Sequence, residues 1–319
     1  MTHPSDIYLR SIAAELPEEI VPLENLRLRS SAEVLAGFGF TGAAIAKDLD
    51  ALTLRAAQRA LSRAGFVPND CGALLYAGAL TTSHTHASES PAHSVLDSFC
   101  YQASWLQETL GLDRATSSGI AQQGCAGFFS ALRQARALLV AEPELNHVLC
   151  VGADAFGPDA QREILYNVVS DAACAAAVSR DHGMARWIAY EQTSKGYYWD
   201  VPAREAELIA AYFPTARMTI QRCLAKARLV PEEIDMIIPT GVNATSWPIL
   251  LRLCGFHDGQ LYQPQHLFGH TIAADSVLYL DEAHRRGLLR PGMRVLLFTY
   301  GFGSSWCALV LEMTEEVTR

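Results

Sequence analysis

Apolar runs and stretches typical of helices alternate along the whole 319-residue chain. The short apolar runs predict strands over 6–14, 73–78, 147–154, 170–178, 236–238, 293–300 and 307–311. Helical spacing of apolar residues, or Ala- and Leu-rich composition, predicts helices over 41–64, 91–110, 128–140, 205–228, 246–253 and 275–286. Strands that alternate with helices in this way favour an α/β fold.

One junction between small residues and a helix carries the clearest candidate chemistry. Cys125 lies where the small residues from Gly119 onward give way to the helix over 128–140, beside the unpaired N–H groups of a helix start. These groups and the positive end of the helix dipole favour a thiolate. Gly124 and Gly127 leave room for a bulky group next to the sulfur. On spacing alone, a buried cysteine that packs among small residues is the simpler interpretation.

Composition and charge narrow the class of protein. Half of the residues are hydrophobic and 18% are charged, which suits a globular enzyme with a large interior. The length predicts two lobes or one large fused core. No run is long enough to span a membrane, and residues 1–20 lack the pattern of a signal peptide. The formal net charge of −9 argues against nucleic acid as the main partner.

The cysteines and histidines give no sign of a metal site. The eight cysteines are scattered without metal-ligand spacing, which predicts reduced thiols in a cytoplasmic protein. A polar loop over 81–90 holds His84, His86 and Glu89, but such side chains in a loop rich in Ser and Thr are more often solvated, and we assign no metal. The aromatic segment 181–202 predicts a lobe boundary and a wall of a substrate pocket or interface. We expect no cofactor.

Several short motifs occur in an order that resembles the thiolase superfamily, and most of all its ketosynthase III (3-oxoacyl-ACP synthase III) branch. In chain order they are Cys125 before its helix, Val151-Gly152-Ala153-Asp154, Ser170-Asp171-Ala172-Ala173, Gly269-His270-Thr271 and Gly301-Phe302-Gly303. The resemblance covers nearly the whole chain. It implies a thiolase fold, five layers αβαβα built from two similar halves, which we place at residues 1–180 and 181–319. It also implies a homodimer.

The resemblance assigns Cys125 as the residue that accepts an acyl group from a thioester, and so reverses the simpler interpretation. The oxyanion formed in that step would be held by the Cys125 N–H and by one N–H of the Gly-rich turn, from Phe302 or Gly303. A donor of this kind lowers the barrier by about 2.7–4 kcal/mol.

Two departures from the family pattern put carbon–carbon bond formation in doubt. Ketosynthase III enzymes carry a Pro-His-Gln-Ala-Asn run and a Gly-Asn-Thr run, whose His and Asn bind the malonyl thioester carbonyl. In this chain Thr240 replaces the His and His270 replaces the Asn, while Asn243 matches the last residue of the first run. We expect Asn243 to shape the loop or the pocket, and Thr240 to fill the vacated volume.

With His270 followed five residues later by Asp275, the chain resembles the variant ketosynthase III-like acyltransferases of natural-product pathways, which use a Cys–His–Asp triad. Cys125 would carry the acyl group, His270 would deprotonate a hydroxyl or amine acceptor, and Asp275 would orient the imidazole. Simpler roles remain open for two of these residues. A lone His at a loop–helix junction is often structural, and Asp275 also suits the first turn of a helix.

The donor is expected to be an acyl carrier protein or acyl-CoA. Family members that use coenzyme A carry a Trp-x-x-x-Arg-Thr-Gly pattern, and the matching run over 34–42 has neither the Trp nor the Arg. A carrier protein is therefore plausible, with a small-molecule acceptor as the second substrate. The alternatives are a condensing enzyme that uses His270 alone, and a non-catalytic ketosynthase-like partner subunit, against which the retained Cys125 argues.

Overall fold

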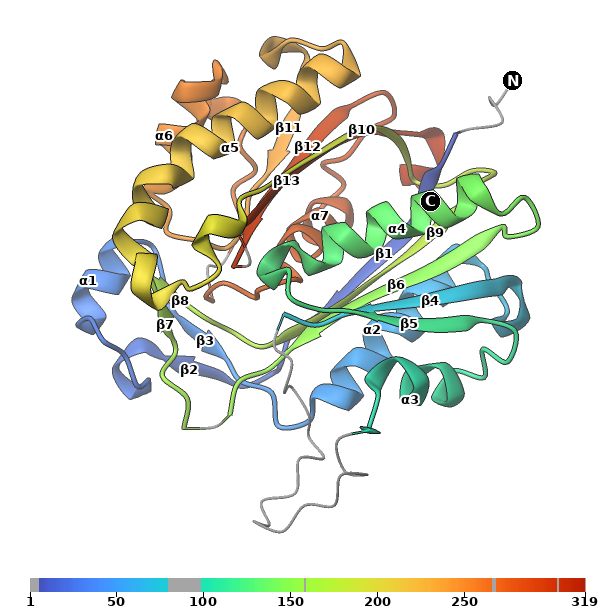
Figure 1. The fold of residues 1–319 in the computed structure, drawn as a ribbon, viewed down its shortest axis with the longest axis horizontal. Coiled ribbons are helices and arrows are strands. Elements are labelled where there is room, and N and C mark those ends of the chain that lie inside the picture. The colour runs from blue at the N-terminus through green and yellow to red at the C-terminus, as the bar shows by residue number, and fades with distance from the viewer. Residues whose placement is uncertain (1–5, 80–98, 158, 266–267, 303, 319) are drawn as a thin grey trace.

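The computed structural model describes residues 6–79, 99–157, 159–265, 268–302 and 304–318. Nine strands are hydrogen-bonded in the order β11-β12-β13-β10-β1-β9-β6-β4-β5 (Figure 1). Their bounds are β1 Tyr8–Glu15, β4 Cys71–Ala77, β5 Thr116–Ile120, β6 His147–Asp154, β9 Ala172–Ser179, β10 Ala185–Ser194, β11 Met236–Ile238, β12 Arg294–Gly301 and β13 Ser305–Met313. Two two-stranded sheets stand apart: β2 (Ile20–Pro22) pairs with β3 (Gly42–Ala44), and β7 (Glu163–Ile164) forms a hairpin with β8 (Asn167–Val168).

The two halves of the chain repeat one pairing pattern. In the first half β4 pairs in parallel with β5 and β6, and β9 pairs antiparallel with both β6 and β1. In the second half β11 pairs in parallel with β12, and β13 pairs antiparallel with both β12 and β10. A parallel bridge from Ile237 to Leu261 stands where β5 stands in the first half. The predicted boundary at 180/181 falls between β9 and β10, and it stays a prediction.

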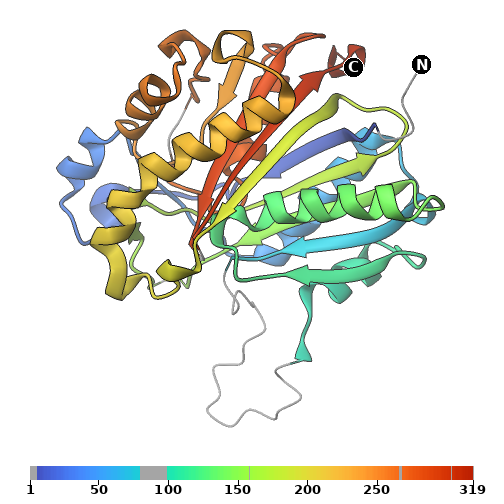
Figure 2. The same ribbon diagram turned by 45° about the horizontal axis from the view of Figure 1, so that its top comes forward.

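Helices lie on both outer faces and between the two halves of the sheet (Figures 1 and 2). The helices are α1 Ala32–Gly37, α2 Leu49–Ala64, α3 Gln102–Thr109, α4 Gly127–Ala141, α5 Glu205–Ala227, α6 Ser246–Cys254 and α7 Asp275–Arg285. The central core contains α4 and α7, one outer core contains α2 and α3, and the other contains α5 and α6. This is the expected αβαβα layering.

The strands explain why the layers form. Along β12, Val295 and Leu297 belong to the central core, whereas Leu296 and Phe298 belong to the outer core with α5 and α6. Successive side chains of a strand point to opposite faces, so a strand covered on both sides reads as a continuous apolar run. That is the run from which the strand over 293–300 was predicted, and the α/β prediction is confirmed.

Three element predictions need correction. The helix expected over 41–64 begins only at Leu49, because Asp48 caps it by accepting a 2.9 Å hydrogen bond from the Ala51 N–H, while Gly42–Ala44 forms β3. In the helix expected over 91–110, residues 91–98 and the whole loop 81–90 lie outside the described residues, and α3 begins at Gln102. The aromatic segment 181–202 is not one wall, since residues 185–194 form β10 and Trp187 packs into the central core, whereas Trp199 lines a cavity.

Among the described residues, we find no helix with both the length and the apolar character needed to cross a membrane. All eight cysteines are free thiols.

Candidate active site

Cys125 sits at a tight bend between the edge strand β5 and helix α4. Gln122 and Gly124 both adopt left-handed φ angles, 63° and 51°, and turn the chain sharply before a 3-10 turn over Gly124–Ala126. The α4 helix then begins at Gly127. Cys125 is therefore held at a helix start, as expected, and its side chain is buried with 7% of its surface exposed.

His270 comes from the opposite half of the chain and reaches the sulfur. Its Nε2 lies 2.9 Å from the Cys125 Sγ. Its backbone is fixed on both sides, because the His270 N–H donates to the Val168 carbonyl at 2.6 Å and its carbonyl accepts from the Ser170 N–H at 2.9 Å. The backbone that carries the imidazole is thus fixed by hydrogen bonds to Val168, the last residue of β8, and to Ser170 just after it.

The Asp275 carboxylate lies behind the imidazole and is saturated with donors. Its Oδ2 contacts His270 Nδ1 and accepts from the Gly241 N–H at 2.6 Å. Its Oδ1 accepts from the Thr271 N–H at 2.7 Å and from the Thr271 hydroxyl at 2.6 Å. The structure therefore brings Cys125, His270 and Asp275 into one continuous row, although 145 residues separate the first two.

A strained residue shapes the loop between the base and its carboxylate. Ile272 has a φ of 56° and is buried against Cys125. A β-branched residue in this left-handed region is a conformational outlier, of a kind that costs about 1–3 kcal/mol and persists where the surroundings impose it. Here the loop from Gly269 to Asp275 is held at both ends by the hydrogen bonds of His270 and Thr271.

The electrostatics favour a charged imidazolium beside the Asp275 carboxylate. Burial by itself would lower the pKa of His270, but the Cys125 sulfur and the Asp275 carboxylate outweigh it and hold that pKa well above its ordinary value. For Asp275, burial favours the neutral acid, yet the imidazole and the Thr271 donors prevail and lower the pKa. Both pKa shifts favour a positively charged His270 next to a negatively charged Asp275.

The Gly-rich turn after β12 packs directly on the backbone around the sulfur. A Cβ on Gly301 would come within 2.0 Å of the Gln123 carbonyl and 3.0 Å of the Cys125 nitrogen. A Cβ on Gly124 would come within 2.5 Å of the Phe302 nitrogen. Only glycine allows this approach, which places the backbone of Phe302 close to the backbone around Cys125. Gly303, the other expected oxyanion donor, lies outside the described residues.

Thr240 and Asn243 both line the same cavity as the row, and each is engaged elsewhere. The Thr240 carbonyl accepts a hydrogen bond from the Trp247 indole at 3.3 Å. The Asn243 side-chain oxygen accepts from the Thr245 N–H at 2.9 Å and its hydroxyl at 2.5 Å, closing a local turn. Asn243 thus lies both in the cavity wall and in a closed turn, and its loop-shaping role stays a prediction.

A cavity of about 720 Å³ opens onto the sulfur and the imidazole. Its wall is apolar and aromatic, with contributions from α5, β12 and the β7–β8 hairpin. Cys125 and His270 are the only ionisable groups of the Cys, His, Asp, Glu, Lys and Arg kinds among the described residues that line it. Burial raises the pKa of the Tyr212 and Tyr300 hydroxyls in this wall, so both stay neutral.

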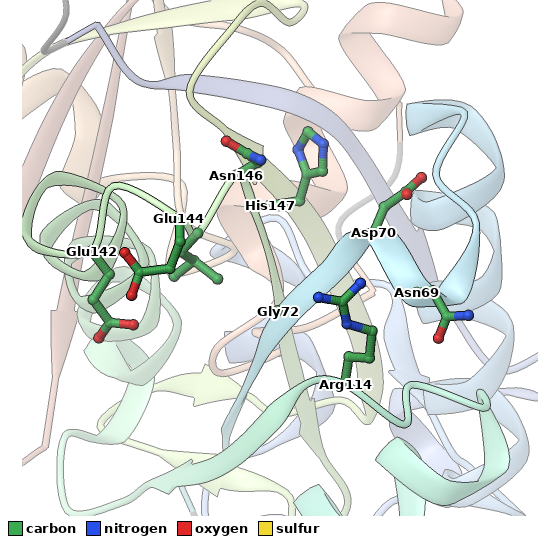
Figure 3. A pocket seen from close by; sticks show the side chains of 9 residues that line it. Asn69, Asp70, Gly72, Arg114, Glu142, Glu144, Asn146 and His147 are labelled. Atoms are coloured by element: carbon green, nitrogen blue, oxygen red, sulfur yellow. The ribbon is translucent and has the colours of Figure 1, made fainter.

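A second cavity, of about 380 Å³, lies at the other ends of the parallel strands (Figure 3). Asp70 and His147 mark the starts of β4 and β6, whereas Cys125 lies beyond their carboxyl ends, about 20 Å away at strand spacing. The described residues that line this second cavity include Arg114, Glu142 and Glu144 but no Cys, Ser or Thr (Figure 3). The carboxyl-end cavity is therefore the candidate active site.

Several wall residues were not singled out from the sequence. They are Gln122, Leu165, Tyr166, Asn167, Tyr212 and Tyr300. Tyr212 and Tyr300 lie in a predicted helix and strand, where an aromatic residue indicates core packing. Leu165 and Tyr166 carry no turn signal, because left-handed turns normally use Asn, Asp or Gly.

Comparison with known proteins agrees with this architecture. The profile of 3-oxoacyl-[acyl-carrier-protein] synthase III matches residues 121–196, and the profile of its C-terminal region matches residues 224–313, together just over half of the chain. The chain belongs to the ketosynthase III branch of the thiolase superfamily. It is thus an enzyme of acyl transfer or condensation.

Individual relatives of this ketosynthase III-like chain are distant but full-length. The beta-ketoacyl-[acyl-carrier-protein] synthase III of Campylobacter jejuni strain RM1221 is 25% identical over 333 residues, covering 97% of this chain and 98% of the relative. The solved structure of the acyltransferase ChlB3 superposes with a TM-score of 0.84 at 24% identity, covering 98% of this chain and all of that one. The 3-oxoacyl-[acyl-carrier-protein] synthase III of Aquifex aeolicus VF5 superposes with a TM-score of 0.82 at 21% identity, covering 96% of this chain and 99% of that one. These superpositions establish the thiolase fold.

Proposed function

We propose that this enzyme transfers an acyl group from a thioester, through Cys125, to the hydroxyl or amine of a small molecule. The observation that carries the proposal is the unbroken row from Cys125 Sγ through His270 to the Asp275 carboxylate. A nucleophile, a base and an orienting carboxylate in contact are the arrangement of acyl transfer by serine and cysteine enzymes.

In the first half-reaction the Cys125 thiolate attacks the thioester carbonyl. The N–H groups of Cys125 and Phe302 stabilise the oxyanion, the carbon–sulfur bond to the carrier breaks, and the departing thiolate takes the proton from the His270 imidazolium. The product is a neutral Cys125 thioester beside a neutral imidazole.

In the second half-reaction His270 acts as the base. Acylation removes the negative sulfur that raises the pKa of His270, so the imidazole can now stay neutral at physiological pH and accept the acceptor's proton. The acceptor oxygen or nitrogen attacks the thioester carbonyl, the bond to Cys125 breaks, and the proton remains on His270. This restores the starting ion pair.

Carbon–carbon condensation is less well supported. In a decarboxylating enzyme two neutral donors must face the malonyl thioester carbonyl to stabilise an enolate. Here Thr240 occupies one position, and the imidazole that occupies the other is paired with a carboxylate through Nδ1. The structural neighbour named as an acyltransferase, ChlB3, gives the proposal further support, and a place in natural-product biosynthesis is part of it.

For the donor we propose an acyl carrier protein. Arg217 and Arg222 are exposed on α5, whose first turns line the cavity through Leu208 and Tyr212. Arg217 lies about 14 Å along the helix axis from Leu208. Carrier proteins are acidic, so exposed arginines on this helix favour their docking despite the net charge of −9. We propose a homodimer formed at the open edge of β5, which is bonded only to β4.

The decisive experiment supplies acyl thioesters of N-acetylcysteamine and follows the intact mass of the protein. We expect an acyl adduct that is absent in Cys125→Ala and that is discharged by an alcohol or amine. His270→Ala should still form the adduct but fail to discharge it. Release of carbon dioxide with chain extension from a malonyl thioester would overturn the proposal in favour of condensation. Absence of any adduct would favour a non-catalytic subunit.

A further inference from the structure

The rim of the active-site cavity exposes two aromatic rings, of which that of Tyr166 has an edge-to-face contact with Phe38. Trp199 is 77% exposed and Tyr166 is 54% exposed, and both line the cavity that contains Cys125. Trp199 precedes α5, and Tyr166 lies at the tip of the β7–β8 hairpin, which stands beside the start of α5 (Figure 1). Exposed aromatic faces at the mouth of a cavity favour contact with a ligand over internal packing.

The hairpin that carries Tyr166 is held in a strained conformation. Leu165 and Tyr166 form its two-residue turn with φ angles of 50° and 60°, which a type I′ turn requires at both positions. Asn and Gly are the residues that adopt this turn without strain, and neither is present. Strain of this kind is typical of sites where side chains must be presented in a fixed direction.

The hairpin is also rigidly anchored. The Glu163 carboxylate accepts hydrogen bonds of 2.7 Å from the N–H groups of Arg29 and Ser30. The Asn167 amide donates to the Ile164 and Leu165 carbonyls at 3.0 and 2.9 Å. The Asn167 side-chain oxygen accepts from the Asn243 N–H at 2.7 Å. The turn is therefore built into the active site and is not a loose surface loop.

The hairpin lies on the side of the base. Two residues beyond Asn167, Val169 forms a parallel bridge with His270, and the His270 N–H donates to the Val168 carbonyl. The free imidazole nitrogen, Nε2, lies 2.9 Å from the Cys125 Sγ, so an acceptor that delivers its proton to His270 must reach this sulfur, beside the hairpin. Cys125 itself is buried in one cluster with Val169 and Ile272, against which Ile164 of β7 packs.

We propose that Tyr166 and Trp199 form the acceptor-binding rim of this enzyme, and that the acceptor is a neutral alcohol or amine carrying a flat ring system. The inference rests on the proposed function. Flatness follows from the two exposed ring faces. The acceptor is expected to be neutral because the described residues of the cavity wall include no Asp, Glu, Lys or Arg to pair with a charged group.

The test uses enzyme that has first been acylated by a hexanoyl N-acetylcysteamine thioester. The acceptors are 2-naphthalenemethanol, its 6-carboxylate, and hexan-1-ol. We expect 2-naphthalenemethanol to discharge the adduct fastest, with the ester oxygen bonded to the acyl carbon, Cys125 released and the proton taken up by His270. Tyr166→Ala and Trp199→Ala should each slow this discharge about 3- to 10-fold without slowing acylation. Equal discharge by all three alcohols, or unchanged rates in both variants, would overturn the proposal.

Two further variants control for general damage. Tyr197 is 55% exposed in the same segment but does not line the cavity, so Tyr197→Ala should leave discharge unchanged. The double variant Leu165→Asn/Tyr166→Gly relaxes the turn and should raise the melting temperature while it slows discharge. If it raises the melting temperature and discharge stays at the wild-type rate, the turn has no part in acceptor binding.

A binding measurement separates this inference from the proposed function. If no thioester acylates Cys125, the proposed chemistry fails, but the rim can still be tested on the unmodified protein. Saturation-transfer NMR with 2-naphthalenemethanol should then show binding that is weaker in Tyr166→Ala and Trp199→Ala and unchanged in Tyr197→Ala. Identical binding in all of these proteins rejects the rim.

Discussion

The Gly241 backbone N–H donates a 2.6 Å hydrogen bond to the Asp275 carboxylate, the group behind the His270 imidazole. Gly241 follows Thr240 directly, so the loop in which Thr replaces the family His is tied to the same carboxylate that orients the new His. A Cβ on Gly241 would lie 2.9 Å from both Asp275 Oδ1 and the Tyr279 hydroxyl. The Thr240 loop and His270, the two departures from the family pattern, thus both contact the Asp275 carboxylate.

Gly241→Ala should impair transfer more than acylation. The added methyl group displaces the loop or the carboxylate, and the imidazole loses its fixed orientation. We expect discharge of the acyl-enzyme to slow about 100-fold, the scale of a misplacement near 1 Å, while the adduct still forms. Adduct formation and discharge by intact mass measure both steps. Equal slowing of the two steps would contradict a role confined to the base.

The pKa of His270 should fall when either neighbour is neutralised. Cys125 and Asp275 both raise it, so Cys125→Ala and Asp275→Asn should each lower it. Since the neutral imidazole is the base, the pH at which discharge by Asp275→Asn reaches half its maximum should move to lower pH, while the maximal rate falls. NMR titration of the imidazole ring in Cys125→Ala and wild type measures the first shift. An unchanged pKa in Cys125→Ala would contradict the switch in protonation on acylation.

Gly301→Ala should slow acylation strongly, because its Cβ would come within 2.6 Å of the Ala126 nitrogen and closer still to the Gln123 carbonyl. Backbone contacts of this kind cannot relax, so the Phe302 N–H moves away from the oxyanion. Loss of one such donor slows acyl transfer about 10²- to 10³-fold. Gly37→Ala is the control, since no atom lies within 4 Å of its Cβ. Retained acylation in a folded Gly301→Ala protein would remove this turn from the oxyanion site.

Asp281 should contribute to stability and not to catalysis. It is fully buried on α7 and pairs with Arg63 of α2, which reaches it past β1 and also donates to the Ile12 carbonyl. Because the arginine is partly exposed, Asp281→Ala should lower the free energy of unfolding by about 2 kcal/mol, less than a fully buried pair. Arg285→Ala, at the exposed side of the same carboxylate, should cost less than about 0.5 kcal/mol. Urea unfolding compares them, and equal losses would refute the distinction.

Local periodicity predicted most of the secondary structure. The elements over 8–15, 205–227 and 275–285 lie close to their predicted bounds, since each carries an uninterrupted apolar pattern. The helix expected from 41 was wrong at its start, because Gly42-Ala43-Ala44 suits a helix by composition but pairs with β2. The β7–β8 hairpin was not predicted, because Leu165 and Tyr166 give no turn signal and adopt their angles only under tertiary restraint.

By itself, the sequence determined the α/β layering, the position of Cys125 at a helix start, and the order of motifs that names the family. These depend on neighbours along the chain, whose spacing is fixed by helix and strand geometry. Only the tertiary structure decided that His270 lies 2.9 Å from Cys125, that Gly241 holds Asp275, and that Tyr166 shares a cavity with Trp199. Contacts between distant segments depend on how the two halves pack, and no local pattern encodes that packing.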